Sequence, residues 1–377
     1  MKKIIFLTGT RADYGKIKSV IQILINSKKY KIYIFVTGMH LLNKYGKTYI
    51  QVLKDFKSKV KIFLSKNQFK NENQDIILSK TINNFSKYVD KIKPDLIVVH
   101  GDRLEALAGS AVGTLKQYLV AHIEGGEISG TVDEHMRHAI SKLSHIHFVA
   151  NSSAKKILTN MGESKKSVFV VGSPDLDLMS SNKTPNISIV KERYNIQFKD
   201  YAVAILHPNT LNLKHLPKEV KVFSNIIMKS KLNYVVIYPN NDPGSDYIIK
   251  NYKKTFNKNK KIKLLKSMRF EYFISLLNNS KFIIGNSSVG IREAPFLGKI
   301  AIDLGDRQKF RSKNPNVKNF KFEEKKVIKF IKNFKNNSIK SKEFGDGKSS
   351  LKINKILNSK SFWKIDIQKH FKRNFTN

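Results

Sequence analysis

Short runs of aliphatic and β-branched residues alternate with longer amphipathic stretches along most of the chain, in two successive blocks. Such alternation is typical of parallel α/β sheets, in which a helix connects each strand to the next. The runs that we expect to form strands are residues 3–7, 32–36, 96–100, 119–122, 146–149 and 168–171 in the first block, and residues 201–206, 234–238, 261–265, 282–284 and 300–303 in the second. The sequence therefore predicts two Rossmann-like, doubly wound α/β domains that face a cleft.

The boundary between the two blocks is marked by residues that break regular structure. Gly172, Pro174 and Pro185 flank a polar Ser-Ser-Asn-Lys stretch. Parallel sheets bind their ligands beyond the carboxyl ends of their strands. We therefore look for chemistry in the residues that directly follow each predicted strand.

The composition excludes several classes of protein. Of the 377 residues 41% are hydrophobic, and the 24 Phe and 14 Tyr exclude the aromatic-poor composition of disordered chains. The longest apolar runs have about four residues, far below the roughly 20 that a membrane helix needs. The run after Lys2 and Lys3 is too short for a secretory signal, so we expect a cytoplasmic protein. The absence of Cys excludes disulfides, thiolate zinc sites and Cys nucleophiles.

The chain is strongly basic, with 70 Lys and Arg against 29 Asp and Glu and a formal charge of +41. The excess is uneven, because residues 309–377 hold 20 basic and 5 acidic residues whereas residues 95–150 hold 4 basic and 7 acidic ones. We interpret the charge as a Lys-rich solvated surface and expect neither a nucleic-acid nor a membrane partner. A protein that binds polyanions through its basic tail is the alternative from another class.

Acidic residues follow two successive strands of the first block. Asp102 and Arg103 come directly after one predicted strand, and Glu124 comes after the next. Two carboxylates that face one crevice each disfavour the ionisation of the other, which suits them to general acid–base catalysis near neutrality. The pattern predicts such a role for Asp102 and Glu124.

The loop after the first predicted strand, residues 8–16, combines two Gly with Arg11 and Lys16 and leads into a helical pattern. Backbone N–H groups at a helix start, with two cations, suit an anionic ligand. The loop matches neither G-x-G-x-x-G nor a P-loop, so it predicts neither a dinucleotide site nor an ATPase.

A later predicted helix is opened by Asp133 and carries Arg137 one turn along. Four His lie in and after this helix. Their spacing does not match H-E-x-x-H and the chain has no Cys, so we expect no metal site.

The second block carries groups suited to a nucleoside diphosphate. The candidates are His207, Asn240, Ser287, Ser288, Glu293 and Arg307. His207 ends a predicted strand and is a candidate neutral donor or general acid. The two Ser lie in a turn between a strand and a helix, where N–H groups and hydroxyls can meet a phosphate. Glu293 can accept both hydroxyls of a ribose.

These motifs, in this order, resemble the hydrolysing UDP-N-acetylglucosamine 2-epimerases of bacterial sialic-acid synthesis and the epimerase half of the bifunctional animal enzyme. The resemblance covers nearly the whole chain, in residues 8–16, 36–49, 100–106, 122–147, 172–177, 207–208, 238–244, 268–273, 285–295 and 305–311. It implies the glycosyltransferase-B type of architecture, with two Rossmann-like domains and C-terminal residues that return to the first. We therefore expect domains at residues 1–176 and 177–360, and a helical tail at residues 361–377 on the first domain.

The resemblance also implies roles for individual residues. Asp102 and Glu124 match the principal catalytic carboxylates, Asp133 matches a third acidic residue near the sugar, and His207 is expected to be catalytic as well. The resemblance and the motifs together predict a UDP-sugar site that includes Arg11, Gly15, Lys16, Arg103, Arg137, His207, Asn240, Met268, Ser287, Ser288, Glu293 and Arg307.

The reaction that the resemblance implies needs no cofactor. UDP is eliminated from UDP-GlcNAc as the C2 proton is removed, and water then adds to the resulting 2-acetamidoglucal to give N-acetylmannosamine. The sequence leaves open which carboxylate is the base. It also leaves open a hydrolysing enzyme for the 2,4-diacetamido-2,4,6-trideoxy UDP-sugar of legionaminic-acid synthesis, and a non-hydrolysing epimerase that retains UDP. The resemblance further implies a homo-oligomer, either a dimer or a tetramer.

Overall fold

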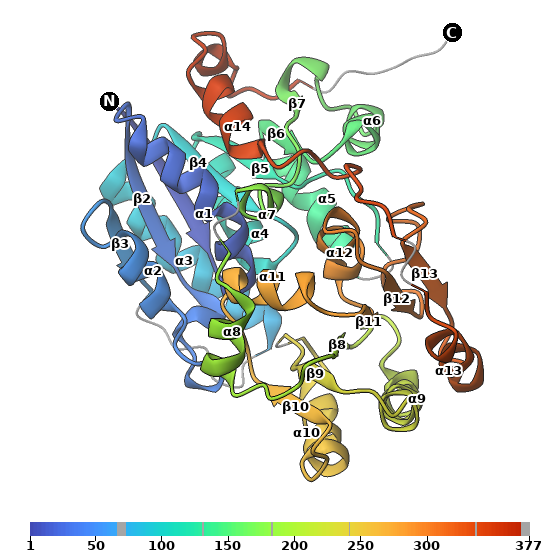
Figure 1. Cartoon of the computed structure of the whole chain (residues 1–377). Coiled ribbons are helices and arrows are strands. Elements are labelled where there is room, and N and C mark those ends of the chain that lie inside the picture. Colours follow the sequence, from blue (N-terminus) through green and yellow to red (C-terminus); the bar gives the residue numbers. More distant parts are fainter. Residues whose placement is uncertain (66–72, 130–131, 182–183, 241, 336–337, 371–377) are drawn as a thin grey trace, which may run out of the picture. The chain divides into compact units, whose positions relative to one another are not determined.

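The computed structural model describes residues 1–65, 73–129, 132–181, 184–240, 242–335 and 338–370. The chain forms two compact units. Unit 1 comprises the described residues of Met1–Glu127, Asp133–Ser181 and Phe344–Asn377, and unit 2 comprises those of Ile128–Val132 and Asn182–Glu343. Each unit is built on one parallel sheet (Figure 1).

The strands of unit 1 alternate with helices along the chain. The strands are β1 (Lys2–Thr8), β2 (Tyr30–Val36), β3 (Lys61–Leu64), β4 (Leu96–His100), β5 (Leu119–Ile123), β6 (Ile146–Val149) and β7 (Val168–Val170). The α-helices are α1 (Arg11–Asn26), α2 (Tyr49–Phe56), α3 (Gln74–Ile92), α4 (Leu104–Leu115), α5 (Asp133–Leu143), α6 (Ser152–Asn160), α7 (Leu176–Ser180) and α14 (Ser349–Leu357).

The described strands of unit 1 form a seven-stranded sheet in the order β3-β2-β1-β4-β5-β6-β7, in which every pair is parallel. The order reverses between β1 and β4. Such a switch point opens a crevice beyond the carboxyl ends of the two central strands. The central strands are largely apolar and buried, as in β4, where all five residues are buried, because helices cover both faces of the sheet.

Helix α1 shows how the local sequence produces the packing. Thr10 and Asp13 form a capping box at its start, which satisfies backbone N–H groups that the helix itself leaves unpaired. Its buried residues recur at helical spacing, from Ile17 through Ile21 to Leu24, and join the core on one face of the sheet.

The C-terminal part of the chain returns to unit 1. Helix α14 packs beside α1 (Figure 1), and Ile353, Leu357 and Phe362 belong to the same core as α1. A 3-10 turn, η6 (Phe362–Lys364), follows. Residues 344–360, which the sequence assigns to the second domain, therefore pack in unit 1. Residues 371–377 of the predicted tail lie outside the described residues.

The boundary between the first and second units also differs from the prediction, which ends the first domain at residue 176. The division falls after Ser181, because α7 stays with unit 1. The Asp177 carboxylate accepts the backbone N–H groups of Ser349 and Ser350 at 2.7 Å each, so it holds the start of α14.

Unit 2 repeats the same plan. Its strands are β8 (Ala202–Ile205), β9 (Tyr234–Ile237), β10 (Ile262–Leu265), β11 (Ile283–Gly285), β12 (Ala301–Leu304) and β13 (Val317–Phe320). Its helices are α8 (Ile187–Tyr194), α9 (Leu216–Lys229), α10 (Ser245–Phe256), α11 (Phe270–Asn278), α12 (Glu293–Phe296) and α13 (Glu324–Lys332). The described strands form a parallel sheet in the order β10-β9-β8-β11-β12-β13, with its switch point between β8 and β11. The predicted class, two doubly wound α/β domains, is confirmed.

The two tips at the switch point of unit 2 approach very closely. Gly285 has a φ of +138°, and a Cβ built there would lie 1.7 Å from the carbonyl oxygen of Ile205. A side chain at this position would therefore force β8 and β11 apart.

Two strands were not predicted from the sequence, β3 and β13. Each has four residues and lies at an edge of its sheet, where one side is open and the apolar pattern is weak. Among the described residues, every helix is too short or too polar to cross a membrane.

Candidate active site

Two acidic turns meet at the carboxyl edge of the sheet in unit 1. Strands β4 and β5 pair in register, with His100 opposite Ile123, so the turn with Asp102 and the turn with Glu124 emerge side by side. The Gly101 N–H donates to the Ile123 carbonyl oxygen at 3.0 Å and joins the two turns directly. The sequence-based placement of the two carboxylates on neighbouring strand tips matches this geometry.

Glu124 is almost completely buried and is surrounded by polar groups. Its carboxylate lies 3.2 Å from Nε2 of His100 and 3.8 Å from Nζ of Lys16, and it accepts a hydrogen bond from the Ser173 hydroxyl. Lys16 also lies 3.1 Å from the buried Asp175. The backbone of Glu124 has a φ of +66°, which is uncommon and costly for any residue but Gly.

Asp102 has a different environment. Its side chain is 30% exposed, and the guanidinium of the buried Arg137 donates to it. Arg137 lies on α5, and its second Nη donates to the Glu127 carbonyl oxygen at 2.7 Å. Arg137 therefore holds the Asp102 carboxylate in place while leaving one side of it open to solvent.

The other predicted residues of unit 1 lie around the same sheet edge. Arg11, Gly15 and Lys16 lie in the first two turns of α1, Arg103 is the cap of α4, and Asp133 is the first residue of α5. Arg103 pairs with the buried Glu105 at 3.6 Å. Each of these helices directly follows β1, β4 or β5, so all five residues share the edge that carries the two carboxylates.

In unit 2 the predicted residues follow the carboxyl ends of the strands from β8 to β12. Asn286 makes two hydrogen bonds to the backbone of His207, accepting from its N–H at 2.7 Å and donating to its carbonyl at 2.8 Å. The Nδ1 of His207 accepts the N–H of Asn240 at 3.3 Å. An accepting Nδ1 carries no proton, so the proton lies on Nε2 and makes that atom a hydrogen-bond donor.

The serine turn after β11 is followed by less helix than the sequence predicts. Ser287 caps a 3-10 turn, η5 (Ser288–Gly290), and Glu293 begins the four-residue helix α12, where it is buried. Gly298, with a φ of +68°, ends this short helix.

Arg307 reaches back to the same turn. Its guanidinium donates to the Asn286 carbonyl oxygen at 3.2 Å, and the Gln308 amide donates to that oxygen at 2.9 Å. Nearby, burial raises the pKa of Asp303 to about 7, although the guanidiniums of Arg307 and Arg311 oppose that shift. Met268 is buried and lies two residues before the start of α11.

The structure thus gathers the predicted residues into two sets. Unit 1 holds Arg11, Gly15, Lys16, Asp102, Arg103, Glu124, Asp133 and Arg137, and unit 2 holds His207, Asn240, Met268, Ser287, Ser288, Glu293 and Arg307.

Sequence reasoning missed three residues around Glu124 and Lys16, namely His100, Ser173 and Asp175. Two signals were available, since His100 ends a predicted strand and Ser173 and Asp175 follow another. Among the described residues no group of His, Asp or Glu could hold a metal ion.

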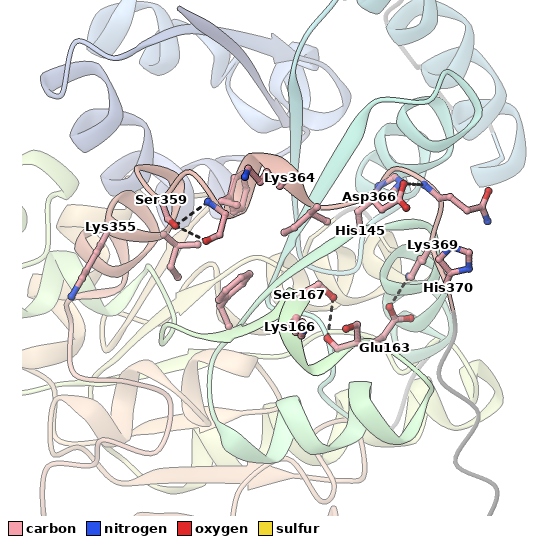
Figure 2. Close-up of a pocket in the computed structure, with 17 residues that line it drawn as sticks. His145, Glu163, Lys166, Ser167, Lys355, Ser359, Lys364, Asp366, Lys369 and His370 are labelled. Carbon is pink, nitrogen blue, oxygen red and sulfur yellow. Dashed lines mark hydrogen bonds and ion pairs between the residues drawn. The ribbon is translucent and has the colours of Figure 1, made fainter.

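A pocket of about 840 Å³ lies elsewhere in unit 1, between β7 and the C-terminal residues (Figure 2). Its walls include His145, Glu163, Phe169, Phe362 and Lys369. The residues predicted for the UDP-sugar site are not among those that line it.

The fold and the two residue sets define the class of the protein. It is a two-unit α/β protein with the glycosyltransferase-B type of fold, with paired carboxylates at the strand tips of one unit and a serine turn and an Arg at those of the other. A crystal structure titled UDP-GlcNAc 2-epimerase from Neisseria meningitidis, bound to UDP-GlcNAc, matches the fold with a TM-score of 0.80 at 21% identity, covering 94% of this chain and 99% of that one.

Sequence comparison places the chain within one family. The family described as UDP-N-acetylglucosamine 2-epimerase matches residues 23–358, and the chain belongs to it. The UDP-N-acetylglucosamine 2-epimerase of Neisseria meningitidis serogroup B is 40% identical over 376 residues, covering 98% of this chain and 99% of the relative.

Two further relatives are named for more specific functions. The hydrolysing UDP-N,N'-diacetylbacillosamine 2-epimerase of Legionella pneumophila is 32% identical, covering 95% of this chain and 96% of the relative. The polysialic acid biosynthesis protein P7 of Escherichia coli is 31% identical, covering 88% and 85%.

Proposed function

We propose that the chain is a hydrolysing UDP-N-acetylglucosamine 2-epimerase, which converts UDP-GlcNAc and water to N-acetylmannosamine and UDP for sialic-acid synthesis. The observation that carries the proposal is the pair of carboxylates, Asp102 and Glu124, on adjacent strand tips. The Legionella relative, whose name includes the hydrolysing reaction, supports the subtype. The name of the Escherichia coli relative supports the pathway.

In the first step a carboxylate removes the C2 proton of the sugar. The electron pair of the C2–H bond forms the C1–C2 double bond, and the bond from C1 to the diphosphate oxygen breaks. UDP leaves, and 2-acetamidoglucal remains. The C2 proton is weakly acidic, so the base must be held close to it. Asp102 and Glu124 are the candidate bases, and Asp133 orients the sugar or the water.

The departing diphosphate needs groups that neutralise its growing negative charge. In the proposal unit 2 supplies them through the Nε2–H of His207, the hydroxyls of Ser287 and Ser288, and the Arg307 guanidinium. Glu293 accepts the ribose hydroxyls. The remaining contacts to the UDP-sugar come from Arg11, Gly15, Lys16, Arg103, Arg137, Asn240 and Met268.

In the second step water adds to the glucal. The water oxygen bonds to C1, one water proton passes to a carboxylate, and a proton is delivered to C2 on the face opposite the one from which the first was removed. The configuration at C2 is thereby inverted, and N-acetylmannosamine is the product. Neither step needs a cofactor or a metal ion.

A second candidate substrate is favoured by one relative. The Legionella enzyme is named for UDP-N,N'-diacetylbacillosamine, and it matches nearly the whole chain. The same carboxylates would perform the same elimination on that sugar, because the reacting atoms at C1 and C2 are common to both. A non-hydrolysing epimerase, which retains UDP, is the third candidate.

Product analysis separates these functions. Phosphorus NMR of the enzyme with UDP-GlcNAc should show free UDP accumulating, and proton NMR of the same sample should show N-acetylmannosamine forming in step with it. Formation of UDP-N-acetylmannosamine without free UDP would identify the non-hydrolysing reaction instead. A much higher kcat/KM for the diacetamido UDP-sugar than for UDP-GlcNAc would replace the proposed substrate.

A further inference from the structure

One histidine that the proposed mechanism does not use lies between the two acidic turns. His122, on β5, is completely buried. Its Nε2 lies 2.7 Å from the carbonyl oxygen of Gly101, the residue before Asp102. Its Nδ1 lies 3.0 Å from the hydroxyl of Ser141 on α5. The ring therefore connects the Asp102 turn to the helix that carries Arg137.

The two partners fix where the proton of this ring lies. A carbonyl oxygen can only accept a hydrogen bond, so Nε2 must carry a proton and donate it to Gly101. Burial lowers the pKa of His122 to about 3, even though the bond to Gly101 opposes that shift. The ring is therefore neutral at any pH at which the enzyme would be assayed, and Nδ1 accepts from the Ser141 hydroxyl.

The Glu124 turn packs against the same pair of side chains. A Cβ built at Gly125, the residue after Glu124, would lie 2.6 Å from Oγ of Ser141 and 2.7 Å from Nδ1 of His122. Only a Gly leaves room for the backbone to come so close. The His122 ring thus holds one acidic turn through a hydrogen bond and supports the other through backbone contact.

We propose that His122 is a positioning residue of the epimerase, whose Nε2–H holds the Gly101 carbonyl and thereby fixes Asp102 relative to Glu124. The proposal rests on the proposed function, because it assigns the positioning to these two carboxylates. A displacement of a reacting group by about 1 Å costs roughly 100-fold in rate, so a small shift of this turn is enough to affect turnover.

Two matched substitutions separate the two hydrogen bonds. The side-chain amide of His122→Gln reaches the position of Nε2 and keeps a donor for Gly101. The shorter amide of His122→Asn lies near the position of Nδ1, keeps the contact with Ser141 and loses the donor to Gly101. Ser141→Ala removes only the hydrogen bond to Nδ1.

The kinetic expectation differs between these variants. We expect kcat with UDP-GlcNAc to fall roughly 10- to 100-fold in His122→Asn with little change in KM. We expect His122→Gln and Ser141→Ala to keep kcat within about threefold of the wild type. A merely structural histidine predicts equal losses in the Asn and Gln variants that follow their melting temperatures, and that result would overturn the proposal.

A second readout needs no substrate. The Gly101 N–H donates to Ile123, so a loosened turn should exchange this amide faster. Hydrogen–deuterium exchange of a peptide covering residues 99–103 should be faster in His122→Asn than in His122→Gln. Equal exchange would contradict the positioning role. Failure of the wild type to release UDP would instead count against the proposed function and leave this comparison intact.

A measurement on the wild type tests the proposal even if one of the variants does not fold. Nitrogen-15 NMR of the labelled imidazole should show a neutral ring with its proton on Nε2 throughout pH 5–8. A proton on Nδ1, or a charged ring in that range, would overturn the proposal directly.

Discussion

The two carboxylates at the centre of the proposal differ in their surroundings. Glu124 is buried beside Lys16 and His100, on a left-handed backbone, whereas Asp102 is 30% exposed and held by Arg137. Two carboxyl groups in unlike environments can take unlike roles in proton transfer. The left-handed backbone of Glu124 is a local cost of the kind that is retained at functional sites.

Removing either carboxylate should slow turnover strongly without unfolding the chain. We expect Asp102→Asn and Glu124→Gln each to lower kcat by roughly 10²- to 10⁴-fold, because each removes a group that transfers protons. The affinity for UDP, measured by calorimetry, should change little, because neither carboxylate is among the proposed nucleotide contacts. Asp95→Asn, which removes a carboxylate at the amino end of β4, is the matched control. Turnover within tenfold of the control in either variant would contradict the assignment.

The sequence was sufficient to place the two carboxylates at neighbouring strand tips and insufficient to identify the residues that surround them. Asp102 and Glu124 directly follow apolar runs, so the rule for parallel sheets places them at the active edge. His122 lies inside such a run and resembles any core residue in sequence. Its role emerges only from the pairing of β4 with β5 and the packing of α5, which periodicity does not specify.

At the scale of elements, α5 is anchored by the C-terminal residues. The Lys369 ammonium donates to the carbonyl oxygens at the end of α5, those of Ser141, Lys142 and Ser144, at 2.7 to 3.0 Å. It also lies 2.7 Å from the buried Glu163, and Figure 2 shows the two side chains meeting at the pocket wall. A cation at the C-terminus of a helix stabilises its dipole, and here it also neutralises a buried carboxylate.

Loss of that cation should destabilise the protein. We expect Lys369→Met to lower the free energy of unfolding by about 3 kcal/mol, because Glu163 and three carbonyl oxygens lose a partner. Urea denaturation measures the change, and Lys364→Met, at an exposed position of the same segment, is the control. The double variant Lys369→Met with Glu163→Gln should recover part of the loss. Equal free energies of unfolding for Lys369→Met and Lys364→Met would contradict the stabilising role of Lys369.

Two physical causes explain where sequence reasoning went wrong about the elements. Strands β3 and β13 are short edge strands, where half-buried residues give little periodic signal. Helix α14 was assigned to the wrong unit because an amphipathic pattern indicates that a face is buried but not against what. The first turn of α14 donates its N–H groups to the carboxylate of Asp177, which is distant in sequence.

At the scale of the whole molecule, acid should affect the two units in opposite directions. In unit 1 burial lowers the pKa of His40 to about 4 and that of His122 to about 3. The unfolded chain binds protons at these rings near pH 6.5, whereas the folded unit does not. The free energy of unfolding of unit 1 therefore falls as the pH drops from about 6.5 toward 4, by up to about 1.4 kcal/mol per pH unit for each ring.

In unit 2 Asp303 has the opposite effect. Burial raises its pKa from 3.8 to about 7, so between these values the folded unit binds a proton that the unfolded chain has released. Its contribution to stability is complete below the unfolded value and is lost as the pH rises through about 7. Acidification from pH 7.5 to 5.5 should thus stabilise unit 2.

Hydrogen–deuterium exchange, corrected for the intrinsic effect of pH, can follow both units in the intact chain. Between pH 7.5 and 5.5 we expect protection of core peptides to fall in unit 1 and to rise in unit 2. Asp303→Asn, which is neutral at every pH, should remove the gain in unit 2. A parallel loss of protection in both units would contradict the prediction.

The proposed reaction depends on removal of the C2 hydrogen of the sugar by the acidic side chains of unit 1. The most direct test is proton NMR of the enzyme turning over UDP-GlcNAc in deuterium oxide. The elimination and hydration steps predict N-acetylmannosamine with a deuteron at C2, formed together with an equal amount of UDP. A product that keeps the original hydrogen at C2 would show that no proton is abstracted there and would contradict the mechanism.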